Sequence, residues 1–572
     1  MYKRKGAKTD KNNWRPISIL PTLSKICESV IHHRVLRHLL DNNIITEKQA
    51  AYLPKDSTTN QLLYIVHQIK LGWAKKKISH ACFLDISAAF DAVWHKALLA
   101  KLKQINIKDN SLKLLQSYLK DRKAKTVVDG AESSEQPVDA GVPQGSRLGP
   151  LLFILFINDI IDNLESTPHI FADDTTLIAT GSDTIETVNL LNRDLEKVSA
   201  WAKKWKVTFN AGKTKDLIFT KKAIDNPQPL IFNNTAVDRV NSHKHLGVIL
   251  TKNLSWDEHL NSIIKQVNLK LSMIYNVRQL SRRTLDIMFK MHVRSCIDYC
   301  IQVFGPSLNS TQIDKLDKLQ YRAARITTMA MKFTSKQKVF IDLGWECIEK
   351  RIEYLSLCLF HKIHIHETRS QIRQCLPPVN QYPNFTRSNK HYSTYPETNT
   401  DFCNSFFPKI STLWNNLPFE MRNKDMVDFK IELGALIKPY KNKLLSIGSR
   451  FGNSIHTQLR LGRSQLNDHL FGVRLSPTSK CLCGNLETTE HYLLECFIYD
   501  IERQTLFSEL PGVLEKQLDK YNRKELTHIL LYGENSDNPE KYEHNKILFR
   551  HVQKFLIQTK RLVYKSKLQY IP

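Results

Sequence analysis

The sequence predicts an α+β fold for its first 255 residues and a mainly helical remainder. Up to residue 255, short apolar runs of strand length alternate with amphipathic segments of helical period, whereas from Trp256 onward the helical period dominates. We therefore divide the 572 residues into a mixed part at 1–255, a helical part at 256–375, a linker and packing segment at 376–439, and a C-terminal region at 440–572.

The mixed part begins with a predicted helix, a strand and a second helix. Residues 14–46 are expected to be largely helical, and "ACFLD" at 81–85 is expected to be a short buried strand that ends near Asp85. A helix is predicted to follow from about residue 87 to residue 102. The apolar residues at helical spacing in the first helix are Leu23, Ile26, Val30, Val35 and Leu39.

Further helix and strand patterns complete the mixed part. "RLGPLLFILFINDIIDNL" at 147–164 predicts a buried helix, and "PHIFADDTTLIAT" at 168–180 predicts a hairpin with a tight acidic turn. An amphipathic helix is predicted at 183–205, with Val188, Leu191, Leu195 and Val198 inward. Short strands are expected around "KDLIFT" and "HLGVIL".

Charge and composition limit the possible partners and location. Lysine and arginine number 83 against 56 acidic residues, a net charge of +27, which favours a polyanionic partner such as nucleic acid; a generic solvated basic surface is the alternative. The N-terminus has no apolar signal core, and the longest apolar block, 151–157, is too short to span a bilayer. The 11 scattered cysteines fit a reducing compartment, so we expect an intracellular protein without a membrane segment.

Two adjacent carboxylates, Asp173 and Asp174, lie inside an apolar run. Burying such groups without partners is costly, whereas a divalent cation that bridges them to a phosphate would offset the cost. Asp85, at the end of the predicted strand, is the natural third ligand. The arrangement is what nucleotidyl transfer by two metal ions needs. The alternative is a solvated acidic turn.

Six motifs stand in one order along the chain, and together they resemble the reverse transcriptases of non-LTR (LINE-type) retrotransposons, the jockey-like branch in particular. The resemblance covers residues 10–260 and continues more loosely to near residue 500. The motifs are "WRPIS" at 14–18, "LDISAAFDAV" at 84–93, "GVPQGSRLGPLLFILFINDI" at 141–160, "FADDTTL" at 171–177, "KWKVTFNAGKTK" at 204–215 and "HLGVIL" at 245–250.

This resemblance implies a right-hand polymerase with fingers, palm and a helical thumb. It implies an RNA-directed DNA polymerase that adds dNTPs to a 3′-hydroxyl with two Mg²⁺ ions, by target-primed reverse transcription. The implied partners are an RNA template, a DNA primer or target, and dNTPs, and the implied location is the nucleus and cytoplasm. The chain would begin within the fingers, so we expect no endonuclease domain in it.

The resemblance also assigns roles to single residues. Asp85, Asp173 and Asp174 would bind the metal ions. Phe90 would close on the sugar of the incoming nucleotide and exclude a 2′-hydroxyl; its alternative is a core aromatic. Asp91 is expected to cap or brace the helix predicted from residue 87 rather than to bind metal.

Four more residues are assigned in the same way. Gln144 and Gly145 would contact the template and the incoming nucleotide, with the glycine permitting a close backbone approach. Lys213 would lie near the leaving pyrophosphate, and a plain surface lysine is its alternative. Arg15 would brace the fingers or meet the template.

The sequence departs from the family pattern at one position. Leu53 stands where the family has an arginine that reaches the triphosphate, and Lys55 lies two residues further on as a substitute. We therefore expect Leu53→Arg to raise nucleotide affinity. The alternative to an active enzyme is a catalytically decayed remnant that acts at most as a nucleic-acid-binding protein.

The helical part contains a basic helix that favours phosphate contacts in a thumb, although a solvated face is the alternative; its cations are Lys315, Lys318, Arg322 and Arg325. In "SFFPKISTLWNNLPFEMRN" at 405–423 we expect only core packing, through Phe406, Leu413 and Trp414.

The C-terminal region contains a Cys/His cluster with the spacing C-x-C-x7-H-x4-C. Three thiols and one imidazole can close a tetrahedral zinc site, and buried reduced cysteines are the alternative. The pattern resembles the zinc-knuckle-like element near the C-terminus of LINE-type proteins. The predicted ligands are Cys481, Cys483, His491 and Cys496.

After Glu543 the chain has no acidic residue. A basic amphipathic helix is expected there, docked on the knuckle and turned toward nucleic acid; an acidic protein surface or a membrane is the alternative partner. Its cations are Lys546, Arg550, Lys554, Lys560, Arg561, Lys565 and Lys567.

Overall fold

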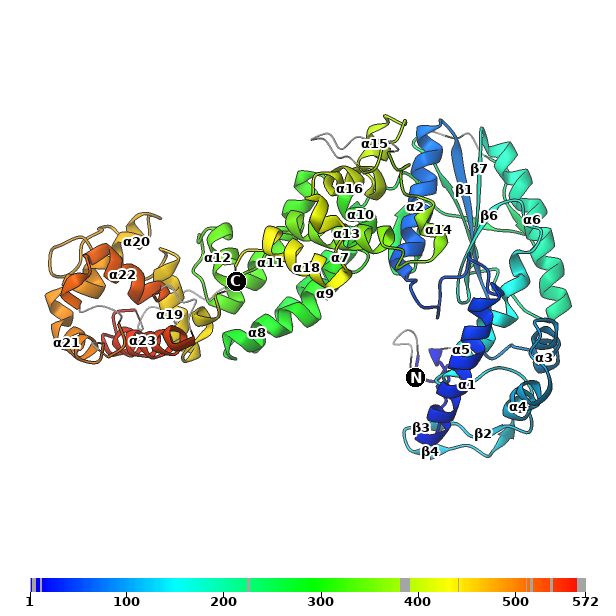
Figure 1. The fold of residues 1–572 in the computed structure, drawn as a ribbon, viewed down its shortest axis with the longest axis horizontal. Helices are drawn as coiled ribbons and strands as arrows, with labels where there is room; N and C mark the ends of the chain where they lie inside the picture. The colour runs from blue at the N-terminus through cyan, green and yellow to red at the C-terminus, as the bar shows by residue number, and fades with distance from the viewer. Residues whose placement is uncertain are drawn as a thin grey trace. The chain divides into compact units, whose positions relative to one another are not determined.

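The computed structural model divides into two compact units that interleave along the chain (Figure 1). Unit 1 comprises Met1–His259, Gln302–Ser307 and Ser356–Met426; unit 2 comprises Leu260–Ile301, Leu308–Leu355 and Val427–Pro572. The predicted thumb, 256–375, contributes to both units. The structure describes residues 2, 7–10, 13–222, 224, 227–380, 391–440, 442–510, 512–514, 518–534 and 539–562.

A five-stranded sheet forms the centre of unit 1, in the order β11-β8-β1-β7-β6. Strand β1 pairs antiparallel with β7 and β8, and β11 joins β8 in parallel. The predicted strand and the predicted acidic hairpin are both confirmed, the hairpin as β6 and β7. The strands are β1 (Ile78–Asp85), β6 (Thr167–Phe171), β7 (Asp174–Gly181), β8 (Lys215–Phe219) and β11 (Asp238–Arg239).

Helices α2 (Thr58–Ala74) and α6 (Thr184–Trp205) cover opposite faces of this sheet (Figure 1). Alternate side chains of a strand point to opposite faces. Accordingly, His80 contacts Thr187 of α6, whereas a Cβ added at Gly72 of α2 would meet the Ser79 hydroxyl. The inward face predicted for α6 is confirmed, since Val188, Leu191, Leu195 and Val198 are all buried.

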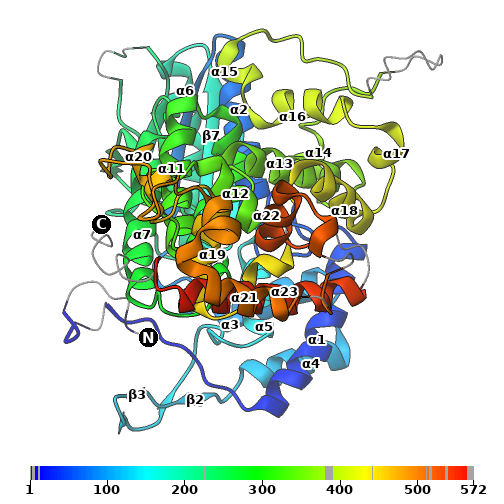
Figure 2. The same cartoon turned by 90° about the vertical axis from the view of Figure 1, so that its left-hand side faces the viewer.

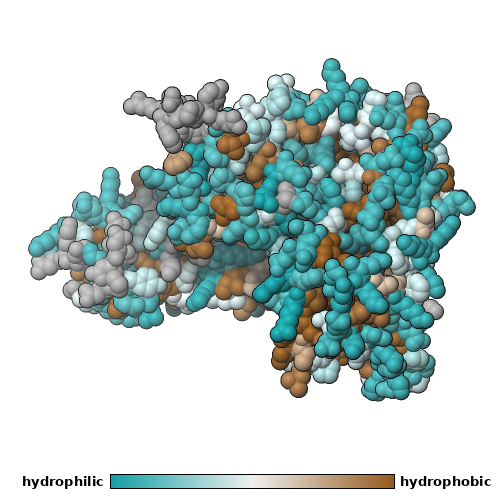
Figure 3. All heavy atoms as spheres, turned by 45° about the vertical axis from the view of Figure 1, so that its right-hand side comes forward, coloured by the Kyte–Doolittle hydropathy of each residue, from teal (hydrophilic) through white to brown (hydrophobic). Residues whose placement is uncertain are grey.

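The first helix is shorter and less buried than predicted. Helix α1 spans Thr22–Asp41 rather than most of 14–46. Its C-terminal half packs in the core through Val35 and Leu39, but Leu23, Ile26 and Val30 are exposed. The helical spacing predicted for these apolar residues is confirmed, but only the C-terminal half of the helix buries them. On the face drawn in Figure 3, hydrophilic side chains predominate and hydrophobic ones gather in local patches.

The helix predicted from residue 87 begins only at His95, as α3 (His95–Gln104). Residues 87–92 instead form turns, with Ala88 at φ 47°. A left-handed residue ends helical hydrogen bonding, and the apolar spacing alone did not reveal it. The buried helix predicted at 147–164 is confirmed as α5 (Leu148–Phe156), followed by a 3₁₀ turn at Asn158–Ile161.

Helix α5 is fixed by α1. The Glu28 carboxylate accepts hydrogen bonds from the backbone N–H groups of Arg147 (2.6 Å) and Leu148 (3.2 Å). These groups begin α5 and have no partner inside the helix, so an anion there satisfies them and matches the helix dipole. Glu28 is accordingly buried.

Smaller elements complete unit 1. The strands expected near "HLGVIL" form a hairpin of β12 and β13, and Phe406 and Trp414 are buried as expected. These elements are α4 (Asp109–Leu119), β2 (Lys123–Ala124), β3 (Val127–Val128), β4 (Ala131–Glu132), β5 (Gln136–Pro137), β9 (Ile231–Phe232), β10 (Thr235–Ala236), β12 (Ser242–His245), β13 (Val248–Thr251), α14 (Ser370–Arg373), α15 (Thr400–Cys403), α16 (Phe406–Asn415) and α17 (Phe419–Arg422).

Unit 2 is helical in the part that the structure describes. Helices α19 (Arg450–Arg460), α22 (Arg523–Tyr532) and α23 (Pro539–Gln558) pack together around its C-terminal core (Figure 2). The helices that contribute wholly or in part to the rest of this unit are α7 (Asp257–Asn276), α8 (Arg282–Met288), α9 (Ser295–Asp298), α11 (Ser310–Thr328), α12 (Lys336–Leu343), α13 (Ile348–His364) and α18 (Met426–Ile437). The second half of α13, from Ser356, belongs to unit 1. Among the described helices of the chain, none has the length and apolar character that crossing a membrane would require.

Candidate active site and metal centre

The three predicted carboxylates lie at one end of the central sheet of unit 1. Asp85 is the last residue of β1, and Asp174 is its register partner on β7. Asp173 precedes it in the two-residue turn between β6 and β7, where Phe171 pairs with Asp174. Two paired strands and one tight turn therefore hold the three side chains with little backbone freedom.

Burial and mutual repulsion act on these carboxylates. Partial burial, followed by the charges of Asp173 and Asp85, raises the pKa of Asp174 from 3.8 to about 6. Burial and the Asp85 charge also raise the pKa of Asp173, against the opposing influence of Arg15 and Lys213. Like charges this close are relieved by a bound cation, and carboxylate oxygens are the ligands that Mg²⁺ prefers. The donor set therefore fits magnesium.

Lys213 is joined directly to this group. Its Nζ lies 3.1 Å from Asp85 Oδ2. The loop that carries it is attached to the same strand end, because the Asn210 N–H donates to the Asp85 carbonyl at 2.7 Å. Lys213 is thus an exposed cation at the edge of the site, with 66% of its side chain accessible to solvent.

Phe90 lies on the turn after β1, half-buried. Its ring stacks on Phe153 of α5 at a centroid distance of 4.7 Å, and the Tyr52 ring meets it edge-on at 6.4 Å. Tyr52 is itself near the carboxylates: burial, then the charge of Asp173, raises the pKa of its hydroxyl. Phe90 therefore has a fixed ring plane, which suits either of its predicted roles.

Gln144 and Gly145 form a turn that docks against the N-terminal segment. Gly145 has φ +117°, and a Cβ there would lie 2.7 Å from the Ser18 carbonyl oxygen. The Ser18 N–H donates to the Gln144 carbonyl at 2.6 Å, and the Gln144 amide donates to both oxygens of Asp91 at 3.2 Å. The backbone that approaches Gly145 closely is that of Ser18, so the contact with template and nucleotide stays a prediction. Asp91 braces this turn rather than the helix that it was expected to cap or brace.

Arg15, Lys55 and Leu53 lie in three different environments. Arg15 is exposed, and its charge acts on Asp173. Lys55 is exposed on a turn at φ 65°, and no described contact links it to the aspartates. Leu53 is only 7% exposed and packs in the core. An arginine at position 53 would have to leave that core to reach a triphosphate, so the expected gain in affinity is not supported.

A cavity of about 330 Å³ opens beside the carboxylates. Its lining combines the acidic Asp85 and Asp174 with three lysines and with two histidines of β12. Its polar lining residues include Asp85, Asp174, Lys213, Lys215, His243, Lys244 and His245. A space lined by both signs of charge is suited to a metal-bound phosphate.

The four predicted zinc ligands converge in unit 2, with their ligand atoms all within 4.8 Å of one another. Cys481 Sγ lies 3.6 Å from Cys496 Sγ, and Cys483 Sγ lies 3.1 Å from His491 Nε2. Gly484, at φ +93°, permits the tight turn after the second cysteine. Three sulfurs and one imidazole nitrogen at this spacing fit a tetrahedral zinc ion.

Outer contacts hold the cluster in place. Glu495 Oε2 lies 3.4 Å from His491 Nδ1, which is the carboxylate–histidine arrangement common behind zinc ligands. Glu487, buried beside the cluster, forms two contacts of 2.5 and 2.6 Å with Arg561, beyond α23. This ion pair docks the residues that follow α23 on the knuckle, and the prediction that Arg561 is turned toward nucleic acid is therefore wrong.

The described part of the basic tail is largely paired within the chain. Lys546 contacts Glu543, and Lys554 contacts Glu509. Arg550 is exposed, whereas Arg561 is mostly covered. The predicted cations Lys565 and Lys567 lie outside the described residues.

Sequence inspection missed three residues that support these sites. Gln49 contacts Ala172 in the turn between β6 and β7, Ser18 contacts Gly145, and Glu495 contacts His491. Glu495 could have been found, because a carboxylate four residues after a helical histidine lies on the same face. Gln49 and Ser18 carry no local signal, since their partners are more than 120 residues away in the chain.

The part of the chain that carries the carboxylate site is similar in sequence to a known protein family. Residues 3–250 match the family described as reverse transcriptase (RNA-dependent DNA polymerase). Residues 3–250 are therefore similar to a reverse transcriptase domain.

Among individual proteins, the chain is similar to the RNA-directed DNA polymerase from the mobile element jockey of Drosophila funebris, at 30% identity over 62% of this chain and 40% of that protein. It is 27% identical to the jockey polymerase of Drosophila melanogaster over 64% of this chain and 41% of the relative. It is 22% identical to the Pol polyprotein of the type-1 retrotransposable element R1 of Bradysia coprophila over 86% of this chain and 47% of the relative. The resemblance to jockey-like retrotransposon polymerases is thereby confirmed.

The chain spans about two fifths of the jockey polymerases that it matches. Among solved structures, apo telomerase from Candida tropicalis aligns with a TM-score of 0.33 and 11% identity, over 62% of this chain and 56% of that chain. The telomerase of Candida albicans in complex with a telomeric RNA fragment aligns with a TM-score of 0.31 and 12% identity, over 54% of this chain and 51% of that chain. TM-scores this low do not define a shared architecture.

Proposed function

We propose that this chain is an RNA-directed DNA polymerase of a non-LTR retrotransposon, with fingers and palm at 1–255 and a helical thumb at 256–375. The observation that supports this most directly is the pairing of Asp85 with Asp174 across β1 and β7, beside Asp173, within a reverse transcriptase domain. The proposed partners are an RNA template, a DNA primer or target, and dNTPs. The proposed setting is target-primed synthesis in the nucleus, after translation in the cytoplasm; the 11 cysteines, all within the described residues, form no disulfide, which is consistent with a reducing compartment.

Each residue of the site then has a task. Asp85, Asp173 and Asp174 would hold two Mg²⁺ ions, which when bound activate the 3′-hydroxyl and neutralise the triphosphate. Phe90, held between Phe153 and Tyr52, presents a flat apolar surface to the sugar of the incoming nucleotide.

The neighbouring residues act on template and phosphate. Gln144 and Gly145 would contact the template and the incoming nucleotide, on a turn that Asp91 and Ser18 hold in place. Lys213 exchanges its contact with Asp85 for the leaving pyrophosphate and stabilises its charge. Arg15 and Lys55 supply further positive charge to the nucleotide or template.

In unit 2 we propose a structural zinc ion bound by Cys481, Cys483, His491 and Cys496. A closed site of four protein ligands leaves no position for substrate, so this ion orders the C-terminal region and takes no part in catalysis. Its support is the convergence of the four ligand atoms.

Primer extension on oligo(dT)-primed poly(A) RNA tests the polymerase proposal. We expect Mg²⁺-dependent extension that Asp173→Asn abolishes, because the change removes a charged metal ligand and preserves the side-chain shape. Asp121→Asn, which makes the same carboxylate-to-amide change on an exposed surface turn, is the control and should extend normally. Absence of extension by the unmodified chain, or full activity of Asp173→Asn, would contradict the proposal.

The second candidate is a nucleic-acid-binding remnant without turnover. Leu53, buried where the family pattern has an arginine, is the observation that favours it. The same assay separates the two candidates, because a remnant would bind the primer–template and extend nothing.

A further inference from the structure

A short backbone segment, residues 44–51, runs beside the strand that leads into the catalytic turn. Its Lys48 carbonyl accepts a hydrogen bond from the Ile170 N–H, and its Ala50 N–H donates to the Ile170 carbonyl, both at 3.0 Å. This pairing is parallel and centred on Gln49. The segment is therefore an extra partner for β6, the first strand of the acidic hairpin.

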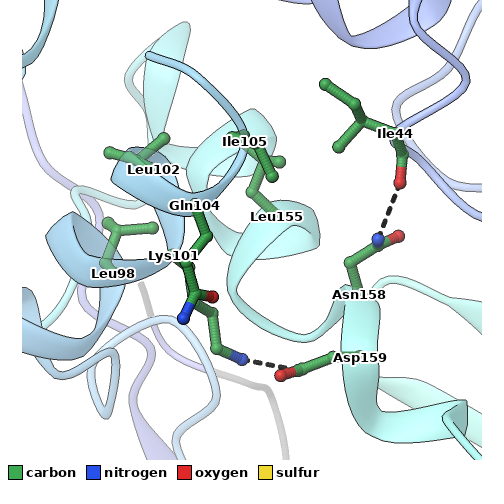
Figure 4. Close-up of a pocket in the computed structure, with 9 residues that line it drawn as sticks. All are labelled: Ile44, Leu98, Lys101, Leu102, Gln104, Ile105, Leu155, Asn158 and Asp159. Atoms are coloured by element: carbon green, nitrogen blue, oxygen red, sulfur yellow. Dashed lines mark hydrogen bonds and ion pairs between the residues drawn. The ribbon is translucent and has the colours of Figure 1, made fainter. Parts of the chain in front are cut away.

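The other end of the segment is anchored by Asn158. The Asn158 amide donates to the Ile44 carbonyl at 2.9 Å and accepts from the Thr46 N–H at 3.0 Å. Figure 4 shows the Asn158 side chain directed at Ile44, beside the Lys101–Asp159 ion pair that joins α3 to the turn after α5. Both ends of segment 44–51 are thus fixed to the body of unit 1.

Gln49 extends this support to the catalytic turn itself. Its side chain is 1% exposed, and its Oε1 accepts hydrogen bonds from the Ala172 N–H at 3.1 Å and the Ala51 N–H at 2.9 Å. Both neighbours are donors, which identifies the atom between them as the carbonyl oxygen. Ala172 directly precedes Asp173 and has φ 55°.

The hydrogen bond between Ala172 and Gln49 has two effects on the turn. A non-glycine residue in the left-handed region is held there only when its surroundings fix it. Its N–H also lies in the turn, outside the ladder that ends at Phe171 and Asp174, and a buried N–H without a partner is costly. The Gln49 carbonyl satisfies that group and fixes the strained residue at once.

We infer that Gln49 is a positioning residue of the active site. Its amide oxygen fixes the Ala172–Asp173 turn and, through it, the directions of the Asp173 and Asp174 carboxylates. The three aspartates repel one another, so without this contact the turn opens away from Asp85. A neutral amide supplies the acceptor without adding a fourth negative charge. The inference rests on the proposed polymerase function for its catalytic meaning.

The first test measures amide hydrogen exchange of Ala172 in the full metal-free chain. Gln49→Met keeps the side-chain volume and removes the acceptor, so exchange at Ala172 should become roughly two- to tenfold faster, which is what loss of one neutral hydrogen bond gives. Gln61→Met is the matched control, because it removes another buried amide, on α2, with no described contact to the turn. It should leave exchange at Ala172 unchanged.

The second test measures Mg²⁺ binding by calorimetry and the Mg²⁺ dependence of primer extension. Gln49→Met should weaken Mg²⁺ binding and lower kcat several-fold, with little change in the KM for dNTP; Gln61→Met should affect neither Mg²⁺ binding nor the split between kcat and KM. Unchanged exchange at Ala172, or unchanged Mg²⁺ binding in Gln49→Met, would overturn the inference. Inactivity of the unmodified chain would contradict the proposed function alone, because exchange and metal binding are measured without turnover.

Discussion

Leu53 shows how the environment of one residue decides what a substitution does. The side chain belongs to the core that α1, α3 and α5 build with the sheet. We expect Leu53→Arg to destabilise unit 1 by about 3–5 kcal/mol, the usual cost of an uncompensated buried charge. Thermal unfolding would measure this as a lower Tm. Leu53→Met, which conserves volume, should cost less than about 1.5 kcal/mol. A Leu53→Arg chain of normal stability and higher nucleotide affinity would show that the side chain escapes to the site.

Asp174 predicts a pH dependence of stability in the metal-free chain. Between pH 3.8 and about 6 the folded state keeps a proton that the unfolded state has released. Its contribution to stability is therefore full below pH 3.8 and is lost as the pH rises to about 6. Relative to the unmodified chain, Asp174→Asn should have a similar Tm at pH 3.5 and a higher one at pH 7.

Two additions make this measurement specific. Saturating Mg²⁺ should reverse the advantage of Asp174→Asn at pH 7, because the ion stabilises only the chain that retains the carboxylate. Asp121→Asn, on an exposed turn, should give a Tm difference that does not change with pH. A constant difference for Asp174→Asn as well would mean that its carboxylate is not perturbed.

Some secondary-structure elements could be predicted from the sequence, and others could not. The α6 face and the β6–β7 hairpin followed from apolar periodicity, since both bury one side in a single core. The start of α3 did not, because one left-handed residue, Ala88, turned a helical pattern into a turn. The exposure of the N-terminal half of α1 could not be predicted for another reason. Apolar spacing shows which residues share a helix face, but it does not show whether another element covers that face.

Some residues of the candidate sites could likewise be predicted from the sequence, and others could not. Asp85, Asp173 and Asp174 could be named because each stands at the end of a recognisable strand, and the four zinc ligands because they share one short segment. Gln49 could not be named, since its contact with Ala172 depends on the tertiary fold. The family resemblance predicts that Lys213 lies near the leaving pyrophosphate. Its contact with Asp85 is a feature of the metal-free chain.

The knuckle element leads to a prediction about folding. Cys481→Ser combined with Cys496→Ser should remove about one zinc ion per chain and lower the Tm of unit 2, because structural zinc contributes folding free energy. Metal analysis and calorimetry would measure both. Cys27→Ser with Cys403→Ser, two exposed cysteines of unit 1, is the control and should change neither. Unchanged zinc content after loss of Cys481 and Cys496 would assign the cluster to reduced core cysteines.

At the scale of the whole molecule, the net charge of +27 predicts RNA binding that weakens steeply with salt. Helix α11 presents Lys315, Lys318 and Arg322 as exposed cations on one face. Replacing all three with glutamine should lower the slope of log K against log salt by about 2 for single-stranded RNA, as expected for three lost phosphate contacts. Filter binding at several salt concentrations would measure the slope.

A control separates phosphate contact from general charge. Replacing Lys120, Lys123 and Lys125, exposed cations near β2, removes the same charge from unit 1. If both triple variants lower the slope equally, the effect belongs to net charge, and the thumb assignment of α11 loses its support.

The interleaving of the two units has a consequence for synthesis on the ribosome. Helix α2 packs against α14, α15 and α16, and His67 contacts the rings of Phe402 and Phe407. These partners are translated some 330 residues after α2. The nascent reverse transcriptase domain therefore emerges with an uncovered apolar helix face and acquires its cover only when residues 370–415 follow. A truncated message that ends at the proposed palm boundary near residue 255 would release a chain that depends on chaperones and is prone to aggregate.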